Sequence, residues 1–150
     1  LLRLQVAAQG FALGDVVHTR LVLEEAVAQA LAADEARDTA AAHRLLAAMD
    51  APELTPAEFL ALDAQLHLSL AEASGNTVIA AMMAGLRTSI ESYVLAGADR
   101  IADWEDMAAT LRAEHRALIG AIDTGEADAA ARLVRAHISG YYRATGLVAG

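Results

Sequence analysis

Helical periodicity runs through almost the whole 150-residue chain and constrains its fold more than any other feature. Apolar residues recur three and four positions apart, the spacing that places side chains on one face of an α-helix. The sequence has no alternating run rich in β-branched residues, and it has only two prolines. A chain of this length is typical of one domain with a substantial core. We therefore expect an all-α protein.

Six helices are predicted, and the short connections between them favour antiparallel neighbours and hence a helical bundle. The clearest start is Thr55-Pro56-Ala57-Glu58, a capping box with proline at the first helical position. That helix should end at Ser74-Gly75. The other expected helices cover about 15–33, 34–49, 76–96 and 103–123, and a last helix starts after 126 and frays toward 146. A break between helices is expected at 97–99.

Composition excludes several classes of function. The formal charge is -9, and the 11 basic residues are all arginine and scattered, so no basic stripe is expected to bind nucleic acid. No apolar run is long enough to span a bilayer, no signal peptide is visible and there is no cysteine, so we expect a cytoplasmic protein without a membrane partner. Because the chain starts at Leu1 and not at methionine, residues 1–14 are expected to be a linker or the end of a missing N-terminal segment, and 15–150 the domain.

An acid and a histidine interrupt the apolar stripe of the helix that follows Thr55. In LDAQLHLSLAEASGN, Asp63 and His67 fall on the same side as Leu66 and Leu70. An ionised carboxylate on a buried face needs a partner, because burying it alone is costly and shifts its pKa strongly upward. The rest of the chain must supply that partner.

Two more histidines, His115 and His137, lie on the apolar faces of the last two predicted helices. Inward faces converge in a bundle, so three imidazoles and Asp63 can meet, and such groups bind divalent metals such as zinc and nickel. The alternative is that each histidine is a core residue bonded to a backbone carbonyl or to Asp63. His18 and His43 have mixed surroundings and are expected at the surface.

Two arginines also point toward apolar faces. Arg20 has mainly apolar helical neighbours, so it either pairs with Glu24 four residues on or clamps an anionic ligand, because guanidinium matches carboxylate geometry. Arg87 lies between Met83 and Ile90 at the same spacing and is a weaker candidate of the same kind. Both are predicted as effector-binding residues.

Three ordered segments resemble motifs of one family. RLVLEEAVAQALAA (20–33) resembles an opening R-x-x-L-E helix, DAQLHLSLAEASGN (63–76) a D-x-x-F-H…S-G-N motif, and EHRALIGAIDTGEADAAARLVRAHI (114–138) a closing E-H…A-I-x-x-G-D…H segment. These motifs are typical of the C-terminal effector-binding (FCD) domain of GntR-type bacterial transcription regulators of the FadR subfamily. The resemblance covers nearly the whole chain.

The resemblance implies an antiparallel bundle of six or seven helices, joined in the intact protein to an N-terminal winged helix-turn-helix that binds operator DNA as a dimer. It also implies a divalent metal in this branch of the family. The positions that match the family's metal ligands are Asp63, His67, His115 and His137. Leu66 replaces a phenylalanine of the motif, and Glu126 stands where a helix-capping aspartate is usual, but neither position is a ligand.

The leading hypothesis is a ligand-sensing domain and not an enzyme. Zinc or nickel, with Arg20 and Arg87, would bind a small organic acid that controls DNA binding by the separate domain of a homodimer. One alternative is a metal-dependent enzyme acting on a small carboxylate, which is less favoured because no inward acid besides Asp63 is predicted to act as a general base. The other alternative is a purely structural bundle with buried histidines.

Overall fold

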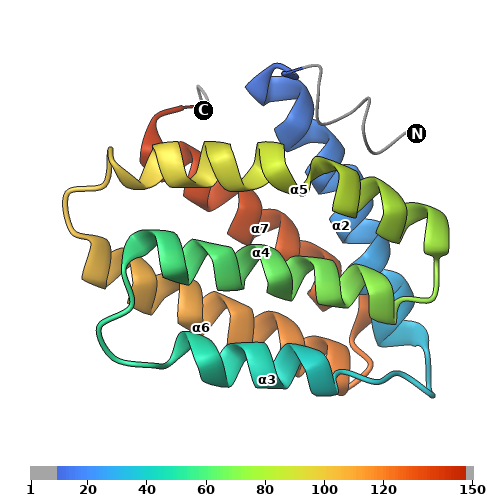
Figure 1. The fold of residues 1–150 in the computed structure, drawn as a ribbon. Helices are drawn as coiled ribbons and strands as arrows, with labels where there is room; N and C mark the ends of the chain where they lie inside the picture. Colours follow the sequence, from blue (N-terminus) through green and yellow to red (C-terminus); the bar gives the residue numbers. More distant parts are fainter. Residues whose placement is uncertain (1–9, 148–150) are drawn as a thin grey trace.

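The computed structural model describes residues 10–147, and this part of the chain contains six helices and no strand (Figure 1). The helices are α2 (Leu13–Ala33), α3 (Ala40–Met49), α4 (Pro56–Ala73), α5 (Thr77–Ala98), α6 (Trp104–Asp123) and α7 (Ala127–Thr145). The predicted all-α bundle is confirmed. Residues 1–9 of the expected linker lie outside the described residues, and α2 already begins at Leu13.

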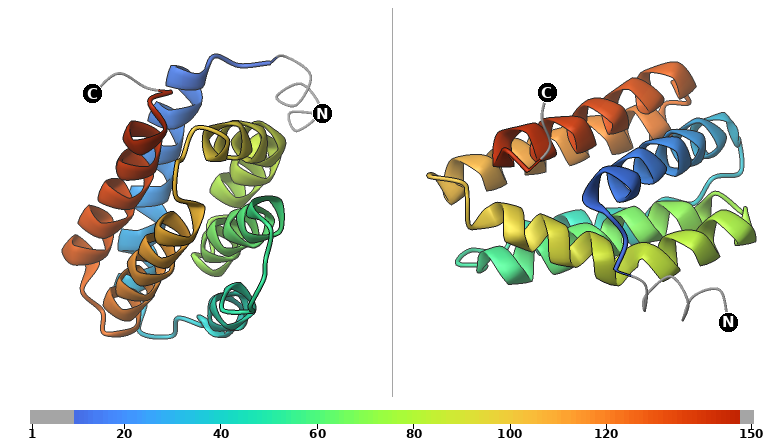
Figure 2. Two further views of the ribbon diagram at one scale, coloured as in Figure 1. Left: turned by 90° about the vertical axis from the view of Figure 1, so that its left-hand side faces the viewer. Right: turned by 90° about the horizontal axis from the view of Figure 1, so that it is seen from above.

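The helices lie alongside one another in a bundle, as the two views of Figure 2 show. The helix α2 packs most extensively on α7, and it also contacts α4, α5 and α6. Further pairs form between α4 and α5, between α6 and α7, and between α3 and α4. The inward faces of α2, α4, α6 and α7 therefore share one core, in which residues distant in sequence become neighbours.

Helix starts follow local rules. The predicted capping box is present: the Thr55 hydroxyl accepts from the Glu58 backbone N–H at 3.1 Å, and the Glu58 carboxylate accepts from the Thr55 N–H at 2.9 Å. Asn76 caps α5 and Asp103 caps α6 through their side chains. Glu126 makes no such bond at the start of α7, as its departure from the family pattern suggests.

The second helix was predicted to begin near Asp34, and this is wrong, because α3 begins at Ala40. The carboxylates of Asp34 and Asp38 each accept a bond of 2.9 Å from the backbone N–H two residues further on. Such local bonds compete with helix formation. Arg37 then holds the loop by donating to the carbonyl oxygens of Ala32, Asp34 and Asp123.

The predicted break at 97–99 comes later than expected, since α5 continues to Ala98. Gly97 lies inside the helix, where a Cβ atom would come within 2.6 Å of the Thr145 Cγ2 atom. Its lack of a side chain lets the end of α7 approach α5 closely. The glycine therefore serves helix packing rather than helix termination.

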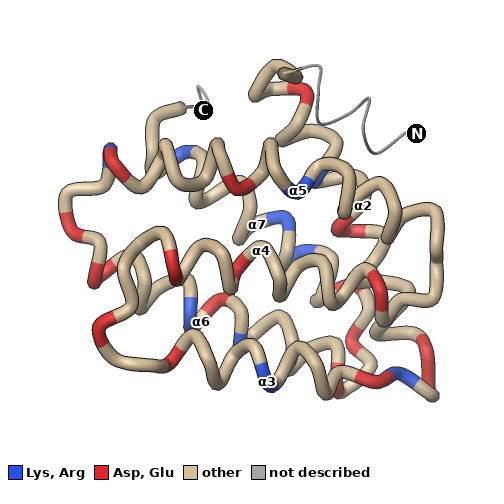
Figure 3. Tube along the Cα trace, in the orientation of Figure 1, with Lys and Arg blue, Asp and Glu red and all other residues tan. Residues whose placement is uncertain are grey.

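Within the described residues, α5 is the one helix long and apolar enough to cross a membrane, although length and composition alone are weak evidence. In this fold it packs against α4 and α2, and it buries Met83, Ile90 and Val94. Figure 3 shows the arginines of the described chain scattered among more numerous acidic residues. No basic stripe for nucleic acid forms on this part of the protein.

Candidate metal centre

Four buried side chains meet between three helices: Asp63 and His67 from α4, His115 from α6 and His137 from α7. One ligating atom of each lies within 4.8 Å of the others. None of the four residues is more than 5% exposed. The structure thus brings together the four residues singled out in the sequence, which we call the histidine centre. Their role as metal ligands stays a prediction.

All three imidazoles turn the same nitrogen toward the middle of the histidine centre. The Nε2 atom of His137 lies 3.2 Å from that of His67 and 3.1 Å from that of His115. The Asp63 Oδ1 atom lies 2.7 Å from His115 Nε2, 3.5 Å from His67 Nε2 and 4.0 Å from His137 Nε2. Three ring nitrogens and one carboxylate oxygen therefore surround a common point.

Two of the outward-facing nitrogens are held by carboxylates. His67 Nδ1 donates to Glu24 Oε1, and His137 Nδ1 donates to Glu114 Oε2 at 2.6 Å. An ionised carboxylate only accepts hydrogen bonds, so it fixes the proton on Nδ1 and leaves the Nε2 lone pair free. Histidines that bind metals are usually oriented in this way by a carboxylate or a carbonyl oxygen.

The contacts inside the histidine centre do not satisfy its polar atoms. Asp63 Oδ1 and His115 Nδ1 are buried without a hydrogen-bond partner, although Asp63 Oδ1 lies 2.7 Å from the other ring nitrogen of His115, Nε2. A buried acceptor without a partner is costly. Nitrogens bound tetrahedrally to one zinc ion at roughly 2.0–2.1 Å lie about 3.3–3.4 Å apart, and the Nε2 separations of 3.1 and 3.2 Å are close to that spacing. The donor set fits a divalent cation.

The charges around the histidine centre also favour a cation. Burial opposes ionisation of Asp63, but the charge of His67 and the closeness of His115 hold the pKa of its carboxyl well below the usual value. Burial disfavours charged His67, yet Glu24 and Asp63 outweigh it and raise its pKa to about 9. Burial lowers the pKa of His115 to about 4 despite Asp63. The carboxylates of Glu24 and Asp63 therefore favour a positive charge at the histidine centre.

Arg20 is buried beside the histidine centre, where it is 3% exposed. Its Nε atom donates to Glu24 Oε2 at 2.7 Å, and NH1 donates to the Tyr142 hydroxyl at 3.2 Å. The pairing with Glu24, considered from the sequence, is thus present. Burial would raise the pKa of Glu24, but the charges of Arg20 and His67 lower it to about 2. Glu24 links the arginine to His67.

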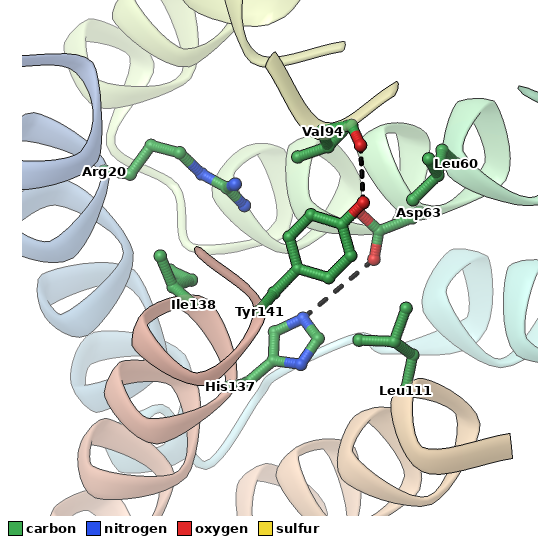
Figure 4. A pocket seen from close by; sticks show the side chains of 8 residues that line it. All are labelled: Arg20, Leu60, Asp63, Val94, Leu111, His137, Ile138 and Tyr141. Carbon is green, nitrogen blue, oxygen red and sulfur yellow. Dashed lines mark hydrogen bonds and ion pairs between the residues drawn. The ribbon is translucent and has the colours of Figure 1, made fainter. Parts of the chain in front are cut away.

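A small cavity borders the histidine centre, and Arg20, Asp63, His137 and Tyr141 face it in Figure 4. Its lining is completed by Leu60, Val94, Leu111 and Ile138. Its free volume is about 10 Å³, room for roughly one water. The Tyr141 hydroxyl donates to the carbonyl oxygen of Val94 and helps to close the space. In this conformation the site does not hold an organic acid.

Arg87 does not line this cavity. It borders a separate small one together with Arg20 and His67, and its Nε atom donates to Glu91 Oε1 at 2.7 Å, with the Arg87 side chain 36% exposed. Its predicted effector role stays a prediction. His18 and His43 are exposed, as expected, and His43 Nε2 contacts Asp123 Oδ2 at 2.8 Å.

Two supporting acids were not identified from the sequence. Glu24 was weighed only as a partner for Arg20, although its place on the inward face was visible, and it is 4% exposed. Glu24 is thus a second inward acid, but it is engaged with Arg20 and His67, and the inference that no inward acid besides Asp63 is well placed as a general base stays a prediction. Glu114 was quoted only as the first residue of the family's E-H motif and was given no role, because its partner His137 lies on another helix.

A helical bundle around one buried aspartate and three buried histidines defines an all-α domain with a polar cluster in its core that could hold a metal ion. The profile of the FCD domain family matches residues 15–140, and the chain belongs to that family. Two curated relatives are 35% identical over 77 residues, and both are named "Putative L-lactate dehydrogenase operon regulatory protein", one from Escherichia coli (strain K12) and one from Shigella flexneri. Each match covers 51% of this chain and 30% of the relative, so it spans less than a third of their length.

Proposed function

We propose that this chain is the effector-sensing domain of a GntR-type transcription regulator of the FadR subfamily, in the branch that binds a divalent metal. Membership of the FCD family and the names of its regulator relatives support the class. The observation that carries the metal proposal is the convergence of three Nε2 atoms and Asp63 Oδ1, with two Nδ1 atoms held by carboxylates.

The four residues of the histidine centre would hold zinc or nickel, since imidazole-rich sites favour these metals over magnesium or calcium. When bound, the metal supplies a positive charge and a Lewis acid in a buried site. Glu24 and Glu114 orient His67 and His137, and the apolar side chains Leu60, Leu111 and Ile138 exclude water. Exclusion of water strengthens electrostatic contacts made there.

A small organic acid is the proposed effector. Arg20 places a permanent positive charge beside the cavity that borders Asp63 and His137, and four protein ligands are fewer than many divalent metals accept. Both features favour an anion inside a protein whose net charge is -9. The relatives are named for an L-lactate dehydrogenase operon, so small 2-hydroxy acids are the first class to test.

Because the cavity is too small for an organic acid, entry of one requires side chains to move, and Arg20 belongs to a chain of contacts that joins three helices. It contacts Glu24 on its own helix and Tyr142 on α7, and Glu24 reaches His67 on α4. An effector carboxylate that takes over these bonds biases the packing of α2 against its neighbours. In a homodimeric regulator with an N-terminal DNA-binding domain, α2 would transmit that bias to operator binding.

Elemental analysis of gently purified protein tests the proposal, with close to one zinc or nickel per chain expected. His137→Ala should abolish binding, whereas His18→Ala and His43→Ala are matched controls because both residues are exposed and outside the histidine centre. Metal-free protein that also fails to take up added zinc or nickel would contradict the site. Turnover of small carboxylates by the loaded protein would favour the enzyme alternative instead.

A further inference from the structure

A second, larger cavity lies at the end of the bundle where the α3–α4 loop meets the first turns of α4 and α6. Its free volume is about 390 Å³, within the range of roughly 300–1,000 Å³ that is usual for small-molecule sites. We call it the end cavity. Its walls include Glu53 and Leu54 from the loop, Phe59 from α4, and Trp104, Glu105 and Arg112 from α6.

The one basic residue that lines the end cavity is already engaged. Arg112 Nε donates to the Met49 carbonyl oxygen at 2.8 Å and lies 4.0 Å from Asp50 Oδ1. Its guanidinium carbon also stands 5.1 Å from the centre of the Phe59 ring, in the range of a cation–π contact. Asp50 in turn pairs with Arg116. Against this one guanidinium the lining sets the carboxylates of Asp50, Glu53 and Glu105, so the end cavity carries a net negative charge.

Two carboxylates of the end cavity remain without partners. Within residues 10–147, neither Glu53 nor Glu105 makes a side-chain hydrogen bond or ion pair, although both line the cavity and both are exposed. Glu53 is also the one non-glycine residue of the described chain with a positive φ, 63°.

The apolar part of the lining contains an aromatic pair. Trp104 is half-buried and packs edge-on against the fully buried Phe59, with ring centres 5.7 Å apart and planes at 81°. Leu54 and Ala108 complete this wall. A pocket with unpaired carboxylates and an aromatic wall suits a ligand with a positive charge and an apolar body, because both parts then find a partner.

We propose that the end cavity binds a small organic ammonium ion with an apolar or aromatic body. The two unpaired glutamates attract its charge, and Trp104 and Leu54 cover its body. The ligand class is opposite in charge to the organic acid proposed for the histidine centre. The inference rests on the end cavity alone and stands whether or not the histidine centre binds a metal.

Trp104 is the only tryptophan of the sequence, so its emission reports on the end cavity without labelling. The full chain is titrated with benzylammonium and, separately, with benzoate, a probe of similar size and opposite charge. Benzylammonium should change the Trp104 emission saturably at concentrations up to the millimolar range, whereas benzoate should not. A saturable change of equal affinity with benzoate, or none with benzylammonium, would overturn the proposal.

Charge-removing variants locate the binding. Glu53→Gln and Glu105→Gln should each weaken benzylammonium binding about threefold, the size expected for one exposed ionic contact. Glu72→Gln is the matched control, because Glu72 is exposed near the other end of α4 and its loss changes the net charge equally. Circular dichroism confirms that each variant is folded. Unchanged affinity for benzylammonium in the Glu53→Gln/Glu105→Gln double variant would show that the two glutamates do not bind the ligand, and the proposal would fail.

Discussion

The histidine centre and the end cavity share the helices α4 and α6, but their charged groups are buried in the first and exposed in the second. Phe59 of the end cavity precedes Asp63 by four residues on α4, and Arg112 precedes His115 by three residues on α6. In the histidine centre all four residues are buried, and the cavity beside them has a free volume of about 10 Å³. In the end cavity there is about 390 Å³, and its free carboxylates are exposed.

The difference shows that the strength of a charged site depends on burial more than on the number of charged groups. Around the histidine centre, the buried charges of Glu24, Asp63 and Arg20 act at close range and raise the pKa of His67 to about 9 and lower that of Glu24 to about 2, despite burial. Low effective dielectric strengthens interactions in the core, whereas solvent screens them at the surface. Effects at the histidine centre should therefore be large and those at the end cavity small.

The largest expected effect is the loss of stability when the metal is removed. A ligand that binds only the folded state, at a free concentration a thousand times its Kd, stabilises the fold by about 4 kcal/mol, which corresponds to roughly 8–16 °C in melting temperature for a chain of this size. Chelation should lower the melting temperature of zinc-loaded protein by this order. An unchanged melting temperature after verified metal loss would mean that the histidine centre does not couple to folding.

Next in size is the effect of Arg20 on the effector. Arg20→Ala should weaken binding of a small 2-hydroxy acid to metal-loaded protein by about 1.5–3 kcal/mol, because it removes a buried charge-assisted contact. Arg87→Ala should change affinity much less, since its side chain is 36% exposed and paired with Glu91. Calorimetric titration of both variants and of metal-stripped protein decides this. Equal affinity for the acid in all forms would mean that neither the metal nor Arg20 binds the effector.

A third prediction separates the two supporting acids. Glu24→Gln should lower zinc affinity about tenfold to a hundredfold, the usual cost of losing a carboxylate behind a histidine ligand. Glu114→Gln should have a smaller effect, because the Glu114 side chain is 37% exposed and water can replace it. Competition with a coloured chelator measures both affinities. A larger loss for Glu114→Gln would reverse the order that burial predicts.

The contrast between the two regions also explains what the sequence could predict. The capping box at Thr55 and the inward positions of Asp63 and His67 depend on residues a few positions apart, and both were predicted. The start of α3 was missed because the carboxylates of Asp34 and Asp38 take up nearby backbone N–H groups, a competition that helical periodicity does not register.

Contacts between helices were harder to predict. Glu24 meets His67 across 43 residues, so its second role appears only when α2 and α4 are packed together. The end cavity left no periodic signal, because its walls come from a loop and from the ends of two helices. Burial of a polar residue on an apolar stripe is a readable pattern, whereas an unpaired carboxylate in a loop resembles any other surface acid.

The smallest effect, and the one that separates the two regions most directly, is the response to salt. Exposed charges lie within reach of counterions, whose screening length falls from about 30 Å at 0.01 M to about 8 Å at 0.15 M ionic strength. Benzylammonium binding at Glu53 and Glu105 should therefore weaken a few-fold over that range, because both side chains are exposed. Zinc affinity at the histidine centre should change less, because its ligands are buried. Trp104 emission and chelator competition, measured on the same protein in the same buffers, give the two responses side by side. If zinc affinity falls with salt as steeply as benzylammonium affinity, the histidine centre is open to solvent in solution, and the contrast drawn from burial is wrong.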